Sequence, residues 1–336
     1  MPRILLRYDM RAPAFGAPAP ALYAAALEQA AFGDAHGFDA VQLSEHHGSD
    51  DGYLPAPLVL AAAIAGRTKR VRLEIAALIL PLHDPLRVAE DVAVLDLASG
   101  GRVDLVIGAG YVPAEFEMFE RAIADRPRLV EEGMRALVQA WTGEPCAYRG
   151  RTVRVTPRPL QRPRPSLALG GSSPASARRA ARLADRFVPA LPHLWKLYRA
   201  ERERLGLPVP PAGRAGPLFL HVADDPEQAW ARIAKHALHE ANAYGRWMSE
   251  ASTAGPYTAM PDADALRASG MYRVVTPDAC VALAEELGPY GTLLLHPLMG
   301  GLPPELGWSS LELFATRVLP RIRTRGPHVS VEGGRG

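Results

Sequence analysis

Cysteine is scarce in this sequence, and so are the signals that would place the chain in a membrane. Among 336 residues there are 2 cysteines, Cys146 and Cys280, which form no CxxC pair and have no nearby histidine at a zinc-binding spacing. No apolar run approaches the roughly 20 residues that span a bilayer, and the segment after Met1 is too short and too polar for a signal peptide. We therefore expect reduced thiols and a cytoplasmic protein without membrane contact.

An excess of charge and the common nucleotide-binding loops are absent too. The 38 basic and 36 acidic residues leave a net charge of +2, which gives no sign of a nucleic-acid groove. The segment 9–16, which follows the first apolar run, is not a GxGxxG turn, and no GxxxxGK[ST] loop occurs. With 48% hydrophobic residues the chain has ample material for a large core.

What the sequence does contain is a regular alternation of short apolar runs and amphipathic stretches. Eight strands alternating with eight helices predict parallel pairing, and the number favours a (β/α)8 TIM barrel of the α/β class over an open sheet. The predicted strands are 4–7, 40–43, 71–77, 103–107, 167–169, 187–189, 218–222 and 293–295. The predicted helices are 21–36, 57–67, 85–98, 128–141, 174–184, 194–205, 226–239 and 309–321.

Two segments interrupt this alternation. Residues 147–157, with Gly150 between two short runs, predict a hairpin between the fourth and fifth units. Residues 239–276 predict a long irregular insertion before the eighth strand, which is either a lid or substrate wall or an oligomer contact. We expect 1–325 to form a single domain and 326–336 to be a disordered tail.

Barrel chemistry occurs at the carboxyl ends of the strands, and there the second strand leads into Glu45, His46 and His47. Histidine titrates near neutrality and can exchange protons with a bound molecule. Neighbouring residues of an extended segment face opposite ways, so His46 and His47 cannot both point inward. A metal site would need further ligands such as His83 or His296, which no ligand spacing connects to these residues, and we predict no metal.

The loop after the fifth strand combines glycine, serine and a helix start. Gly170 and Gly171 let the backbone approach a ligand, and Ser172 and Ser173 supply hydroxyl groups. The helix that begins at Pro174 directs its free N–H groups to the same place. This pattern is typical of a phosphate cup, but Ser173 acting only as a helix N-cap explains it equally well.

These stretches, taken together, resemble the luciferase-like family of flavin-dependent monooxygenases and reductases. The resemblance covers the chain from about Phe38 to Trp308, and His83–Gly110 is its most specific part. The matching stretches are 37–47, 61–73, 76–96, 99–110, 169–173 and 276–279.

The resemblance implies a flavin lying across the barrel mouth. His46 would be the acid-base group beside the flavin ring, with Glu45 and His47 next to it, and Arg126 would be the phosphate-side arginine, with Arg128 as its rival. The peptide bond between Ala76 and Ala77 would be cis and would lie against the ring. The remaining flavin-binding residues implied are Gly108, Gly110, Gly170, Gly171, Ser172, Ser173 and Ser176.

The family also implies an activity and partners. We expect a monooxygenase that uses oxygen and reduced FMN, supplied by a separate reductase, on a small, mainly apolar organic substrate. Hydride transfer with the deazaflavin coenzyme F-420 remains an alternative, because Ala109 replaces the arginine that bacterial luciferase carries there and leaves the flavin open. A flavin-binding partner subunit without activity is a further alternative, since barrel folds can host such proteins. We expect a homodimer, for which helix 85–98 offers Val88, Val92 and Leu95, although these could equally pack on the barrel.

Overall fold

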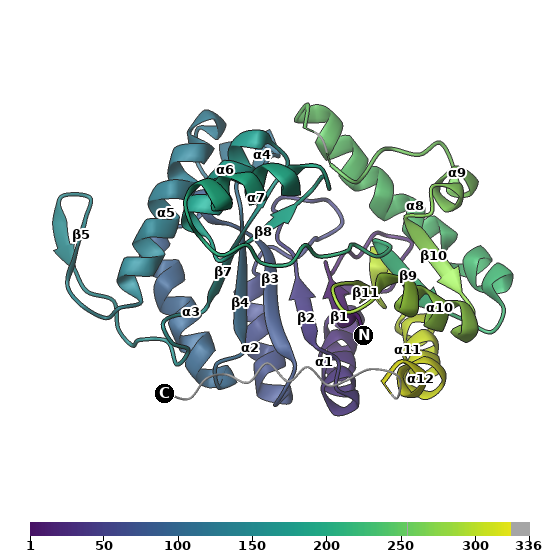
Figure 1. The fold of residues 1–336 in the computed structure, drawn as a ribbon. Helices are drawn as coiled ribbons and strands as arrows, with labels where there is room; N and C mark the ends of the chain where they lie inside the picture. Colours follow the sequence, from purple (N-terminus) through teal and green to yellow (C-terminus); the bar gives the residue numbers. More distant parts are fainter. Residues whose placement is uncertain (254, 324–336) are drawn as a thin grey trace.

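A single parallel sheet surrounded by helices forms the body of the molecule (Figure 1). The computed structural model describes residues 1–253 and 255–323. The predicted disordered tail, 326–336, lies outside the described residues, as do the last two residues of the predicted domain. In the part that is described, no helix is both long and apolar enough to cross a membrane.

The main sheet has the strand order β10-β9-β11-β1-β2-β3-β4-β7-β8, and its pairings are parallel. Its strands are β1 (Arg3–Tyr8), β2 (Ala40–Leu43), β3 (Arg72–Ile79), β4 (Val103–Gly108), β7 (Ser166–Gly171), β8 (Arg186–Pro189), β9 (Phe219–Val222), β10 (Tyr272–Val275) and β11 (Thr292–Leu295). All eight predicted strands are present, and the first, β1, pairs with the last, β11, as in a (β/α)8 barrel. The predicted fold class is therefore confirmed. The additional strand, β10, lies beside β9, so pairing among the described residues ends at β8 and β10.

Six of the predicted helices are confirmed with small shifts at their ends. The helix predicted at 226–239 extends 11 residues further, to Glu250, and the last predicted helix is divided by a π-turn. The helices are α1 (Ala19–His36), α2 (Pro57–Arg67), α3 (Pro85–Ser99), α4 (Pro113–Met118), α5 (Arg126–Ala140), α6 (Pro174–Leu183), α7 (Leu194–Arg204), α8 (Pro226–Glu250), α9 (Ala263–Ala268), α10 (Pro277–Leu287), α11 (Pro304–Leu313) and α12 (Leu319–Arg323). Short turns are η1 (Leu80–Leu82), η2 (Ile123–Asp125), η3 (Met299–Gly301) and the π-turn η4 (Phe314–Val318). Many helices begin with proline, whose missing N–H costs nothing in a first turn.

The prediction of an irregular insertion at 239–276 is wrong, because most of this segment is regular. Helix α8 continues to Glu250, and α9 and β10 follow it. Polar side chains that suggest a loop in the sequence have hydrogen-bond partners within this segment. Glu240 accepts a hydrogen bond from the Tyr272 hydroxyl at 2.8 Å, and Asn242 bonds both backbone groups of Met260.

The predicted hairpin is confirmed. Strands β5 (Cys146–Tyr148) and β6 (Arg151–Val153) pair antiparallel, and Gly150 between them has the positive φ of 74° that favours glycine. The hairpin belongs to a separate two-stranded sheet and projects from the body of the molecule (Figure 1).

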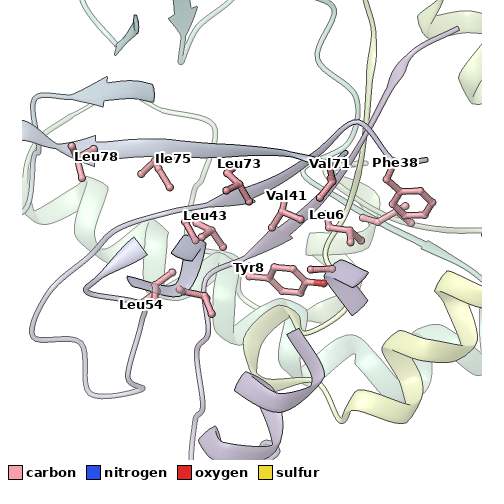
Figure 2. Close-up of a cluster of buried hydrophobic side chains, with 14 of the residues drawn as sticks. Leu6, Tyr8, Phe38, Val41, Leu43, Leu54, Val71, Leu73, Ile75 and Leu78 are labelled. Carbon is pink, nitrogen blue, oxygen red and sulfur yellow. The ribbon is translucent and has the colours of Figure 1, made fainter. Parts of the chain in front are cut away.

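Apolar side chains of β1, β2 and β3 fill the space between the sheet and its helices (Figure 2). Helix α3 contributes to the same core, in which Val88, Val92 and Leu95 are buried. These three side chains therefore cannot form a free dimer surface, and the alternative of packing on the barrel is the one observed.

Candidate functional site

Small residues form an open floor where β3, β4 and β7 end. Ala76, Ala77, Gly108, Gly110 and Gly170 are all partly exposed, although the strands behind them are mostly buried. The peptide bond between Ala76 and Ala77 is cis, as the resemblance predicts. A Cβ atom on Gly108 would lie 2.9 Å from the Cβ of Ala77, so glycine is needed for β4 to approach β3 this closely. A floor without long side chains suits a flat ring system.

Beside this floor, two imidazoles converge on the carboxylate of Glu45. Its Oε1 lies 2.9 Å from Nε2 of His47 and 2.6 Å from Nε2 of His83, and its Oε2 accepts the backbone N–H of Ile79 at 2.6 Å. Burial alone would raise the pKa of Glu45, but the hydrogen bonds from His47 and His83 outweigh it and hold the pKa at about 2. Glu45 therefore ties the strand that carries the floor to both histidines.

His46 faces the opposite way from Glu45 and His47, as the alternation of an extended segment predicts. Its Nδ1 lies 2.7 Å from Oε1 of Glu115, a residue of α4, and the pair is buried. Its Nε2 lies 3.4 Å from the hydroxyl of Tyr111, which follows β4. The structure thus brings His46 together with Glu115 and not with Glu45.

Aromatic side chains enclose His46. The ring centroid of Trp247 lies 4.4 Å from that of His46, Tyr53 lies at 4.9 Å, and Tyr244 at 5.9 Å. The guanidinium of Arg11 lies within 5.0 Å of all three aromatic ring centroids and holds them together by cation–π contacts. Because Tyr244 and Trp247 belong to α8, the second half of this helix forms a wall beside His46, consistent with one of the two predicted roles of the segment.

A second buried polar group lies behind this wall. His296 lies between two carboxylates, with Nε2 3.4 Å from Asp9 and Nδ1 3.4 Å from Glu240. Burial opposes a charge on this imidazole, but the two carboxylates raise its pKa. These groups anchor α8 to the ends of β1 and β11.

The fold brings together residues that no metal-ligand spacing connects in the sequence. Glu45, His47 and His83 offer ligand atoms within 4.8 Å of one another, and so do Asp9, Glu240 and His296. Hydrogen bonds or ion pairs already link the atoms of each group. The absence of a metal stays a prediction.

At the β7 end, serine side chains cap α6. Ser173 accepts the N–H of Ser176 at 3.2 Å, and the Ser176 hydroxyl accepts the N–H of Ser173 at 3.1 Å, which forms a capping box. The Ser172 hydroxyl is less committed, since it lies 3.5 Å from that of Thr253. A Cβ atom on Gly171 would lie 2.2 Å from the Ser176 hydroxyl oxygen, so only glycine fits there. The capping role is therefore present. Pro174 has no N–H, and the N–H groups of Ser176 and Ala177 donate to Ser173, so the Ser172 hydroxyl and the N–H of Ala175 are the donors left for an anion.

Two arginines compete for the phosphate-side position. Arg128 is exposed and is engaged with Glu132 at 2.9 Å and Asp125 at 3.1 Å. Arg126, at the start of α5, is half-buried and has no ion pair among residues 1–253 and 255–323. Helix α5 packs on α6. The geometry leaves Arg126 as the more available cation.

Glu115, like Arg11 and Tyr53, is a residue of this site that the sequence did not predict. It lies 69 positions from His46 and belongs to no motif that points to an active site. The one feature of the sequence that bears on Glu115 is the proline two residues before it, which predicts the start of a helix just after β4. Only the packing of α4 against the β2 loop brings it to His46.

Comparison with known proteins gives one family. The model of the luciferase-like monooxygenases matches residues 10–287. The chain is 31% identical over 171 residues to the uncharacterized protein y4vJ of Sinorhizobium fredii, covering 49% of each chain. It is 27% identical over 162 residues to the oxygenase component of a flavin-dependent trigonelline monooxygenase of Acinetobacter baylyi, covering 46% of this chain and 45% of that one. The chain thus spans about half the length of the curated relatives it matches.

Solved structures match over almost the whole chain. The monooxygenase RslO1 of Streptomyces bottropensis is 27% identical, with a TM-score of 0.78 over 95% of this chain and 99% of that one. The oxygenating constituent of 3,6-diketocamphane monooxygenase of Pseudomonas putida, in complex with FMN, is 22% identical, with a TM-score of 0.73 over 96% and 99%. A coenzyme F-420-dependent secondary alcohol dehydrogenase is 17% identical, with a TM-score of 0.71 over 96% and 100%. The last two structures, at 22% and 17% identity, show only that this chain has the same fold as they do.

Proposed function

Because this chain belongs to the luciferase-like monooxygenase family, we propose that it is a flavin-dependent monooxygenase that uses reduced FMN and oxygen on a small, mainly apolar organic substrate. Reduced FMN, when bound, would supply the electrons that activate oxygen. The observation that carries the proposal is the small-residue floor of β3, β4 and β7. This floor lies next to β2 in the strand order, and His46 follows the end of β2. On its other side, β7 leads into the start of α6.

The phosphate would lie at the start of α6. Gly170 leaves room for it, and the Ser172 hydroxyl and the N–H of Ala175 would donate hydrogen bonds to it. Ser173 and Ser176 fix the turn through their capping box, for which Gly171 makes room. Arg126 would add a positive charge. This assignment makes binding depend on a phosphate group rather than on the ring alone.

The flavin ring would lie on the floor formed by Ala76, Ala77, Gly108 and Gly110. Glu45 supports this floor from below, because its carboxylate binds the backbone N–H of Ile79 just beyond the cis peptide. His47 holds Glu45 in place. In this proposal Glu45 and His47 shape the site, while His46 exchanges protons within it.

The aromatic wall indicates the class of substrate. Tyr53, Tyr244 and Trp247 enclose His46. The two tyrosines are buried, so the partly exposed indole of Trp247 is the ring that a substrate would meet, and its surface is largely apolar. Such surfaces favour apolar or aromatic molecules and exclude water from the reacting atoms. We therefore propose a substrate whose reacting part is apolar.

The deciding experiment is a titration of the purified protein with reduced FMN and, separately, with reduced F-420, each followed by fluorescence. Tight binding of reduced FMN, together with oxygen consumption and oxygenated product from an added apolar substrate, is the expected result. Preference for F-420 without oxygen consumption would identify a hydride-transfer enzyme instead. Binding of FMN without turnover of any substrate would favour a partner subunit without activity.

The proposed activity requires a source of reduced flavin. The trigonelline enzyme is described as an oxygenase component, which supports a separate reductase as partner. We also propose that the chain forms a homodimer, through exposed apolar side chains of α2 and α3.

A further inference from the structure

The strongest unassigned feature of the site is the carboxylate that holds His46. Oε1 of Glu115 lies 2.7 Å from Nδ1 of His46, and both side chains are buried, with exposed fractions of 1% and 7%. A hydrogen bond of this length between an imidazole and a carboxylate, shielded from water, is strong and directional. It therefore fixes the orientation of the ring.

The carboxylate is itself held in place. The same Oε1 accepts the backbone N–H of His47 at 2.9 Å, so Glu115 binds two consecutive residues of the β2 loop. Next to it, Phe116 packs against Ile79 and Leu82 in a small buried cluster that anchors α4. Glu115 thus has little freedom to move away from the imidazole.

From this geometry we propose that Glu115 is the positioning residue of His46. Because a carboxylate accepts hydrogen bonds, Nδ1 of His46 carries the proton, and the lone pair of the neutral ring lies on Nε2. Nε2 is the atom that faces the hydroxyl of Tyr111, which follows β4 and is partly exposed. Glu115 thus directs the proton-exchanging nitrogen to the site, and its negative charge stabilises the imidazolium that forms when Nε2 accepts a proton.

The neighbouring glutamate cannot play this part. Glu45 precedes His46 in the chain, but its Oε1 is taken by His47 and His83 and its Oε2 by a backbone N–H. Glu115, by contrast, has an Oε2 without a hydrogen-bond partner in the described residues. The pairing of His46 thus comes from α4 and not from its own loop.

The kinetic test of this role rests on the proposed function, because it measures turnover. A second measurement that does not depend on turnover is therefore needed. We compare Glu115→Gln, which keeps the shape and removes the charge, with Glu117→Gln, the same substitution at an exposed position of α4. Turnover should fall about tenfold to a hundredfold in Glu115→Gln, with little change in FMN affinity. The pH at which turnover is half-maximal should also move, while Glu117→Gln matches the wild type.

Two further measurements separate positioning from general damage. Combining Glu115→Gln with His46→Ala should cost no more turnover than His46→Ala alone, because Glu115 acts through the imidazole. Nitrogen NMR of the labelled histidine ring should show the proton on Nδ1 in the wild type and in Glu115→Asp, and a mixed tautomer in Glu115→Gln.

Full additivity of the two substitutions would overturn the proposal, and so would a His46 ring with its proton on Nε2 in the wild type. If Glu115→Gln fails to fold, Glu115→Asp and the wild-type NMR signal still decide the question. If the wild type neither binds flavin nor turns over, the proposed function fails, yet the NMR experiment still tests the pairing of Glu115 and His46.

Discussion

Two adjacent histidines at the end of β2 serve different carboxylates. His46 pairs with Glu115 on one side of the chain, and His47 pairs with Glu45 on the other. The alternation of side chains along an extended segment predicts this division from the sequence alone. The identity of the partners could not be predicted, because Glu115 and His83 reach these histidines only through tertiary packing.

His46 should therefore matter more for turnover than His47. We expect His46→Ala to lose about 10²–10⁴ in rate, the usual contribution of a general acid-base group, and to keep most of its FMN affinity, because the phosphate is proposed to bind at α6. His47→Ala should cost less, since its ring points to Glu45. Stopped-flow oxidation and product formation measure both effects. The reverse ranking would show that His47 is the proton-exchanging residue.

The depressed pKa of Glu45 predicts a loss of stability in acid. Its pKa of about 2 lies below the usual 4.5, so the stabilising charge is fully present above about pH 4.5 and is lost as the pH falls toward 2. Urea unfolding between pH 5.5 and 3 should show the wild type losing more free energy than Glu45→Gln, by an amount that reaches about 2 kcal/mol at pH 3.

This pH range leaves His83 out of the comparison. The pKa of His83 is raised by its contact with Glu45, so its contribution is complete below its usual pKa and disappears only as the pH rises through the raised value. Parallel curves for the wild type and Glu45→Gln below pH 5.5 would mean that folding does not lower the pKa of Glu45.

At the scale of elements, the turn from β7 into α6 shows how a local signal can have two meanings. A Ser-Pro pair after two glycines predicts both an N-cap and a phosphate cup. The structure shows that Ser173 and Ser176 form the cap. Sequence alone could not separate these roles, because they use the same residue types in the same turn.

Ser172→Asp should separate them. The new charge would lie where the phosphate is proposed to bind, while the capping box of Ser173 and Ser176 stays intact. We expect FMN affinity to fall at least tenfold, or about 1.4 kcal/mol, and the affinity for riboflavin, which has no phosphate, to change little. Equilibrium fluorescence titration of both ligands measures this, and Ser172→Asn is the neutral control. An equal loss of affinity for FMN and riboflavin would show that the start of α6 does not bind the phosphate.

At the scale of the whole molecule, the eight βα units could be predicted because each strand is a short apolar run followed by an amphipathic helix. The region from 239 to 276 could not, because its regularity depends on buried polar contacts. Glu240 and Asn242 look like loop residues in the sequence, yet they lie in α8 because Tyr272 and Met260 satisfy them. These contacts become visible only once the chain has folded.

A homodimer is the prediction that concerns the molecule as a whole. Val59 of α2 is 72% exposed, and Val94 and Leu97 of α3 are 54% and 42% exposed. The two helices pack against each other, and we propose that a second copy removes these exposed apolar side chains from water. Light scattering should report twice the chain mass of 36.2 kDa.

The dimer can be tested without disturbing the core. Val94→Lys combined with Leu97→Lys places two charges on exposed positions, which the folded monomer tolerates but a dimer through α3 does not. We expect this variant to have the mass of a single chain, whereas Val138→Lys, at a 38% exposed position of α5, should stay dimeric. A wild type with the mass of one chain at micromolar concentration would refute the dimer, and a double-lysine variant that stays dimeric would move the interface away from α3.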